Sequence, residues 1–97
     1  MQLSKTDIGA VLEIIEDIED RDYCEQELIA LFVPVEAWMV FDGMAIIPGK
    51  NVLLAIALWI GADIGNSPID DNGKIRFHRL RICIRKHAIE LRDSLTQ

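Results

Sequence analysis

The chain has one long uninterrupted apolar segment, residues 52–60, and this segment limits the folds that are open to it. Nine residues are too few to cross a bilayer, because a membrane-spanning helix needs about twenty. The turn sequence Pro-Gly-Lys-Asn at residues 48–51 separates the segment from the apolar residues before it, so no longer span can be assembled. We therefore expect a buried core segment and no membrane association.

Two secondary structures suit this segment. Its Leu, Ala and Trp content and its extension through Ile64 favour a helix that is capped by Asn51 and buried on nearly all sides, with Trp59 in the core. A β-hairpin over residues 44–58 is the alternative, because the periodicity of a short apolar run does not separate a strand from a buried helix.

The first residues predict an amphipathic helix. Ser4 or Thr6 can cap it, and its apolar residues follow at steps of three, one, three and three, which places them on one helical face. These residues are Ile8, Val11, Leu12, Ile15 and Ile18. The crowding of acidic side chains towards its C-terminal end opposes the helix dipole, so we expect a break at residues 20–22.

Two shorter helices should follow this break. We expect one over about residues 23–32, because Pro34 disfavours helical geometry in the residue before it. Pro34 can then start a short helix that runs through Phe41 and is ended by Gly43. Trp38 in this helix suits either the core or a surface contact.

Residues 74–95 carry two overlapping patterns. Apolar residues at steps of three or four predict one long helix, and no breaker interrupts its helix-forming sequence. A strand over residues 75–84 is the alternative, since Leu80, Ile82 and Ile84 also alternate with other residues. The expected fold is mainly α, a small helical domain of about four helices with a long basic C-terminal helix.

A chain of 97 residues, 51% of them hydrophobic, should form a single domain around one core. Cys24 and Cys83 are too few for a disulfide framework, and the first ten residues lack the features of a signal peptide, so we expect reduced thiols and a cytoplasmic protein. The domain 1–97 divides into an acidic helical front (1–42), an apolar core segment (44–64), an exposed proline loop (65–73) and a basic tail helix (74–95).

Charge is distributed unevenly along the chain, whose formal net charge is −6. Residues 1–42 hold eleven acidic and two basic residues, whereas residues 74–97 hold seven basic and two acidic ones. Two interpretations fit the acidic cluster, namely imitation of a DNA phosphate backbone and an ordinary solvated surface. The cluster consists of Glu13, Glu16, Asp17, Glu19, Asp20, Asp22, Glu25 and Glu27.

The basic residues of the tail are expected to bind a partner. On a helix, Arg81, Arg85 and Arg92 share one side, and Arg76, Arg79 and Lys86 lie on neighbouring stripes. Few aromatic residues accompany them and the whole chain is negative, so we expect no strong direct nucleic-acid binding, although a small nucleic-acid-binding accessory protein is an alternative. The acidic front, or an acidic protein surface, is at least as suitable a partner.

The sequence offers little material for catalysis. Cys83 and His87 would share a helix side, where they could bind zinc with His78 or Cys24, or act as nucleophile and base. A second pair with ligand spacing is missing, and no orienting partner or oxyanion donor can be identified. We therefore predict no metal, no cofactor and no enzymatic activity.

The residues of the proline loop favour turns and exposure, and the bond between Ser67 and Pro68 can populate the cis form. Through its length, its acidic front, its basic tail and the loop sequence Gly65-Asn66-Ser67-Pro68-Ile69-Asp70, the chain resembles the anti-RecBCD proteins of lambdoid phages. The resemblance covers nearly the entire chain.

This resemblance implies a phage-encoded protein of the host cytoplasm that binds the RecC subunit of the host RecBCD helicase-nuclease, alters its response to Chi and favours phage recombination. It also implies recruitment of a host peptidyl-prolyl isomerase, for which Pro68 is a better candidate than Pro34 or Pro48. The expected partner-binding residues lie in the loop and the tail, and they are Asn66, Ser67, Pro68, Ile69, Asp70, Arg76, Arg79, Arg81, Arg85, Lys86 and Arg92.

Overall fold

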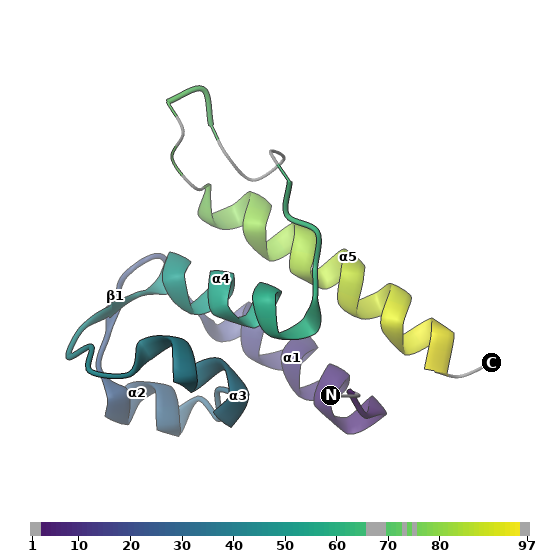
Figure 1. Cartoon of the computed structure of the whole chain (residues 1–97), viewed down its shortest axis with the longest axis horizontal. Helices are drawn as coiled ribbons and strands as arrows, with labels where there is room; N and C mark the ends of the chain where they lie inside the picture. The colour runs from purple at the N-terminus through teal and green to yellow at the C-terminus, as the bar shows by residue number, and fades with distance from the viewer. Residues whose placement is uncertain (1–2, 66–69, 73, 75, 96–97) are drawn as a thin grey trace.

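A computed structural model describes residues 3–65, 70–72, 74 and 76–95 of the chain (Figure 1). Their secondary structure is mainly helical, which confirms the expected fold class. In chain order the elements are α1 (Lys5–Asp17), β1 (Asp22–Tyr23), α2 (Glu25–Ala30), α3 (Val35–Trp38), the 3-10 helix η1 (Met39–Phe41), β2 (Ile47–Pro48), α4 (Gly49–Ile60) and α5 (Phe77–Leu95).

Helix α4 occupies the middle of the fold. It packs against α5 on one side and against α3 on the other, while α5 also lies along α1 (Figure 1). Its apolar sequence explains this position, since its buried residues face several directions. They are Gly49, Val52, Leu53, Ala55, Ile56, Ala57 and Ile60. The apolar segment 52–60 is therefore part of a helix. None of the described helices is long and apolar enough to cross a membrane.

Helix α1 begins as the sequence predicts. The backbone N–H of Asp7 donates to the Ser4 hydroxyl oxygen at 3.1 Å, and the Ser4 N–H donates to the Asp7 carboxylate at 3.0 Å. This capping box identifies Ser4, not Thr6, as the cap. The helix ends at Asp17, before the predicted break, and its buried face consists of Ile8, Val11, Ile14 and Ile15.

The start of α4 differs from the prediction. Pro48 is the residue before the helix, so Asn51 lies inside the first turn and is not its cap. The backbone N–H of Gly49 donates to the carbonyl oxygen of Arg21 at 2.7 Å. A Cβ atom at this position would overlap the carbonyl oxygen of Glu19, so only glycine allows the α1–β1 connection to approach so closely.

The other end of α4 also differs, because the helix stops at Ile60 and does not extend through Ile64. Gly61 adopts a left-handed conformation, with φ at 73°, and its N–H donates to the carbonyl oxygens of Ala57 and Leu58 in the last turn. A glycine is the residue that most readily adopts this geometry, which explains why the helix ends there although Ala62 and Ile64 continue the apolar pattern.

The two strands of the described chain are short; β2 lies inside the range 44–58 of the hairpin alternative, and β1 lies outside it. β1 and β2 pair antiparallel, with Asp22 opposite Pro48 and Tyr23 opposite Ile47. A short two-stranded pairing is therefore present, as the alternative allowed, but the partner strand is at residues 22–23, and residues 49–58 belong to α4. Residues 77–84 belong to α5, so the alternative of a strand at 75–84 is wrong.

The remaining helices are slightly shorter than predicted. α2 covers Glu25–Ala30, α3 begins at Val35 with Pro34 as its cap, and a 3-10 turn continues it to Phe41. α5 begins at Phe77 and buries Phe77, Leu80, Ile84 and Ala88 on one face. These four residues step by three or four, as the helical interpretation of the tail requires.

Candidate protein-binding surface

The C-terminal end of α2 places a phenylalanine in an unusual conformation. The N–H of Phe32 donates to the Ile29 carbonyl at 3.0 Å, and the N–H of Val33 donates to the Leu28 carbonyl at 3.2 Å. These two bonds form a Schellman motif, in which the residue at the Phe32 position is left-handed and usually glycine. Phe32 has φ at 57° and is the one non-glycine residue with positive φ in the described part of the chain.

Phe32 belongs to a run of apolar side chains that face solvent. It is 83% exposed, Met39 is 81% exposed and Leu58 is 63% exposed. We call the run the apolar band, and its members are Ile29, Phe32, Trp38, Met39, Val40, Met44 and Leu58. A large contiguous apolar surface on a small protein is typical of a binding site.

Three shallow hollows connect the members of the apolar band. The first, of about 520 Å³, lies between Phe32 and Trp38. Trp38 also lines the second, of about 610 Å³, which in turn shares Phe41 and Met44 with the third, of about 170 Å³ beside Leu58. Because neighbouring hollows share lining residues, the band is continuous from α2 to α4.

Trp38 is fixed in this surface. Its Nε1–H donates to the carbonyl oxygen of Val33 at 2.8 Å, and the side chain is half-buried against the core. Trp38 therefore packs partly against the core and partly lines the surface, while its contact with a partner stays a prediction. Trp59, in contrast, packs against the core from α4 and lies beside Leu3 and Leu91.

The rim of the apolar band is acidic. Glu25 and Asp42 line the second hollow, and Glu36 is exposed on α3. In the sequence, residues 22–49 contain five acidic residues and no Lys or Arg. The surface therefore combines apolar contact area with negative charge.

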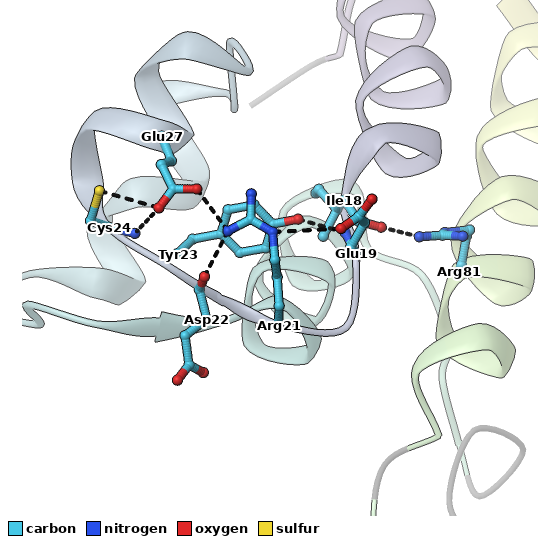
Figure 2. Close-up of polar contacts among 8 residues, drawn as sticks. All are labelled: Ile18, Glu19, Arg21, Asp22, Tyr23, Cys24, Glu27 and Arg81. Atoms are coloured by element: carbon cyan, nitrogen blue, oxygen red, sulfur yellow. Dashed lines mark hydrogen bonds and ion pairs between the residues drawn. The ribbon is translucent and has the colours of Figure 1, made fainter.

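A polar network at the α1–β1 connection holds α2 in place (Figure 2). The Arg21 guanidinium forms ion pairs with Glu27 at 2.7 Å and Glu19 at 3.6 Å, and its carbon lies 4.0 Å from the centroid of the Tyr23 ring. Tyr23 is buried, and its hydroxyl oxygen accepts from the backbone N–H of Glu19 at 2.6 Å. The network ties the start of α2 to the end of α1.

Glu27 also completes the N-terminal cap of α2. Its carboxylate accepts from the backbone N–H and the Sγ of Cys24, each at 3.5 Å (Figure 2). The hydrogen bond from Arg21 lowers the pKa of Glu27 and, reciprocally, raises the pKa of Arg21. Both members of the pair therefore stay charged over the neutral pH range.

The two arginines of the tail nearest to α1 are engaged within the chain. Arg81 donates from Nη2 to the carbonyl oxygen of Ile18 (Figure 2). Its guanidinium carbon lies 4.8 Å from the centroid of the Phe77 ring. Its Nε is buried with no hydrogen-bond partner among the described residues. Arg85 forms a salt bridge of 2.5 Å with Glu16. Acidic front and basic tail therefore contact each other directly.

The other basic residues of the tail face solvent. Arg76, Arg79 and Lys86 are exposed, and Arg92 lies 3.8 Å from the carboxylate of its neighbour Asp93. Of the six tail residues predicted to bind a partner, these four are the ones that a partner can reach without breaking a contact between α1 and α5. The prediction that all six bind a partner stays a prediction.

Four of the predicted loop residues, Asn66, Ser67, Pro68 and Ile69, lie outside the described residues. Asp70, the fifth, accepts from the backbone N–H of Asn72 at 2.9 Å and of Lys74 at 2.8 Å. These backbone bonds, that of Lys74 first, lower the pKa of Asp70. Asp70 thus closes a turn that leads into α5.

The residues considered for catalysis or metal binding lie on α5 and at the start of α2. His87 Nε2 lies 3.1 Å from the carbonyl oxygen of Ile60, which links α5 to the end of α4. Cys24, at the N-terminal cap of α2, and Cys83, on α5, are free thiols. Among the residues that the structure describes, no group of three His, Cys, Asp or Glu side chains has the arrangement to hold a metal ion.

No family model, curated protein or solved structure matches this chain. The apolar band was not recognised from the sequence, because Ile29, Phe32 and Met39 belong to the residue types that normally form a core. One signal was available, namely that the predicted helix ends at a phenylalanine with no glycine at its C-terminal end, where glycine is usual.

Proposed function

We propose that this chain acts by binding a protein and that its partner is the host RecBCD helicase-nuclease, contacted through RecC. The observation that carries the proposal is the apolar band with its acidic rim. Burial of such a surface against another protein removes apolar area from water, which is the main source of affinity in protein association. The resemblance of the sequence to anti-RecBCD proteins supplies the identity of the partner.

In this role the protein is a phage-encoded modulator in the host cytoplasm, and not an enzyme. By occupying RecC it alters the response of RecBCD to Chi and so favours phage recombination. The exposed cations Arg76, Arg79 and Lys86 provide a second contact region, suited to an acidic protein surface. A host prolyl isomerase acting on the bond between Ser67 and Pro68 is part of the same proposal.

The two other functions considered from the sequence receive less support. DNA mimicry requires free carboxylates along the front, but Glu16 is paired with Arg85 and Glu27 with Arg21. Direct nucleic-acid binding by the tail requires free arginines, but Arg81 and Arg85 contact α1. In both cases some of the charge that a nucleic-acid-related role needs is already neutralised inside the chain.

The test uses the purified chain with purified RecBCD and with the isolated RecC subunit. We expect stable binding to both and a changed yield of Chi-specific fragments from linear DNA that contains Chi. The double variant Arg79→Glu, Lys86→Glu should bind more weakly, whereas Glu13→Gln, Asp17→Gln on the front is the matched control and should bind as the unchanged chain does. Failure of the chain to bind RecC contradicts the proposal.

A further inference from the structure

The phenylalanine at position 32 contributes little to the stability of the fold. The left-handed conformation that closes α2 is easily adopted by glycine and is strained for a residue with a Cβ atom. The phenyl ring does not recover this loss through burial, because the side chain is 83% exposed. A strained residue whose side chain contributes little to the fold indicates a role in contact with another molecule.

The surroundings of Phe32 are suited to receive apolar side chains. The hollow beside it is lined by Ile29, Val33, Pro34 and Trp38. Trp38 is held by its hydrogen bond to Val33, so this part of the surface is formed before a partner arrives. Rigid aromatic residues at the centre of a surface are the usual anchors of protein interfaces.

The negative charge around the apolar band favours a partner with basic residues. Glu25 and Asp42 line its second hollow, Glu36 is exposed on α3, and no Lys or Arg occurs between Arg21 and Lys50 in the sequence. A second copy of this chain would bring one acidic rim against another, which is unfavourable. A partner with basic residues flanking its apolar side chains would instead meet opposite charge.

We propose that the apolar band binds a basic amphipathic helix of a partner protein, with Phe32 as the anchor residue. The series of three hollows suits the side chains that such a helix presents at i, i+3, i+4 and i+7. Lys or Arg at its flanks would lie near the carboxylates of the rim. This inference rests on the proposed protein-binding role, but not on RecC being the partner.

The first experiment measures binding of a synthetic helical peptide with Leu at those positions and Lys at its flanks. The fluorescence of Trp38 reports binding in a Trp59→Phe background. We expect saturable binding, and binding at least about tenfold weaker for the same peptide with Glu in place of Lys. Equal binding of the two peptides, or no binding of the Lys peptide, overturns the proposal.

The second experiment separates contact from conformation. Phe32→Gly should weaken peptide binding about tenfold and at the same time raise the thermal unfolding midpoint, because it removes the anchor and the backbone strain together. Met39→Ala is a second variant, expected to weaken binding without raising the midpoint. Unchanged peptide binding by Phe32→Gly overturns the role of Phe32, and so does a lower midpoint.

Two further outcomes are informative. A dimer in light scattering that Phe32→Gly dissociates would show that a second copy occupies the band, which overturns the proposal. If the chain fails to bind RecC but binds the Lys peptide through Phe32, the proposed function is wrong and the inference holds. If RecC binds the Phe32→Gly variant as tightly as the unchanged chain and the Lys peptide does not bind, the proposed function holds and the inference is wrong.

Discussion

Glu16 and Arg85, which are 69 positions apart in the sequence, form an ion pair in which Nη2 of Arg85 lies 2.5 Å and Nε 2.8 Å from the same carboxylate oxygen. The pair joins α1 to α5. Arg81, one turn earlier on α5, donates to the carbonyl oxygen of Ile18, which follows the last residue of α1. The opposite charges of the two ends of the chain therefore serve first to hold the fold together.

These two arginines should differ in their effect on stability. Arg81→Ala removes a charged hydrogen bond to a backbone carbonyl and the contact with Phe77, so we expect the free energy of unfolding to fall by about 1–2 kcal/mol. Arg85→Ala removes a pair that is partly exposed, so we expect a loss of only about 0.5 kcal/mol. Urea unfolding followed by circular dichroism measures both.

Arg79→Ala is the control for this comparison, because Arg79 is exposed on the same helix. It should leave the urea midpoint nearly unchanged. A loss for Arg85→Ala as large as that for Arg81→Ala would contradict the assignment of Arg81 as the stronger link between α1 and α5.

Gly49 is predicted to tolerate no side chain. A Cβ atom would overlap the carbonyl oxygen of Glu19 and lie 3.1 Å from that of Arg21, so Gly49→Ala must displace the β1–β2 pair. We expect the free energy of unfolding to fall by about 2–4 kcal/mol, as for other overpacked sites. The matched control is Gly9→Ala in α1, where nothing lies within 4 Å and the gain in helix propensity should stabilise the fold by about 0.5–1 kcal/mol. Thermal unfolding of both variants tests the contrast, and a midpoint for Gly49→Ala equal to that of the unchanged chain would refute it.

The elements that local sequence determines were predictable. α1 has a capping residue and an apolar stripe, and α5 has a long helical periodicity, so both were found from the sequence. The pairing of Tyr23 with Ile47 was not, because it joins two-residue strands that are far apart in the sequence and that no local strand pattern marks. The start of α4 at Gly49 also involves a contact between distant segments, namely the hydrogen bond from the Gly49 N–H to the carbonyl oxygen of Arg21.

The candidate site was harder to predict than the fold. Met39 and Phe32 have the composition of core residues, and only the three-dimensional arrangement shows that they face solvent. The roles of Arg81 and Arg85 were predicted only in part, since the acidic front was one of three partners considered for the tail, beside nucleic acid and an acidic protein surface. Sequence shows which charges are present, but the fold decides which of them meet.

The free energy of unfolding should fall at acid pH because a small set of carboxylates becomes protonated. Hydrogen bonds from the backbone of Ser4 and of Lys74 lower the pKa of Asp7 and Asp70, and the Arg21 side chain lowers that of Glu27. A carboxylate whose pKa is lower in the folded state stabilises the fold above its unfolded pKa, about 4, and this stabilisation is lost as the pH falls through the folded value.

The urea midpoint should therefore be lower at about pH 3 than at about pH 6. Glu27→Gln removes one of the responsible groups, so its midpoint should change less between the two conditions. Glu13→Gln, for an exposed residue of α1, is the control and should retain the full change. A full change in the Glu27→Gln variant would argue against a role for the Arg21–Glu27 pair.

The proposed action of a prolyl isomerase gives a prediction for the loop. Pro68→Ala should abolish binding of the isomerase without lowering the thermal midpoint by more than a few degrees. Pro48→Ala is the control proline, because Pro48 is half-buried and pairs with Asp22 between β1 and β2. The test is a pull-down with the purified isomerase, and retained binding by Pro68→Ala would show that the site lies elsewhere.

Phe32 and Gly61 should respond in opposite directions to exchange between glycine and a larger residue. Both are left-handed, with φ at 57° and 73°, and both end a helix. Phe32→Gly should stabilise the fold by about 1 kcal/mol, because the strain of a Cβ atom in this conformation is removed. Gly61→Ala should destabilise it by about 1–2 kcal/mol, although its Cβ atom would meet open space.

The variant Phe32→Ala separates the backbone from the ring. It keeps the Cβ atom and therefore the strain, so its free energy of unfolding should stay close to that of the unchanged chain. Urea unfolding of the three variants gives the comparison. If Phe32→Ala destabilises the fold by more than about 1 kcal/mol, the ring packs against the chain in solution and is not held outward for a partner.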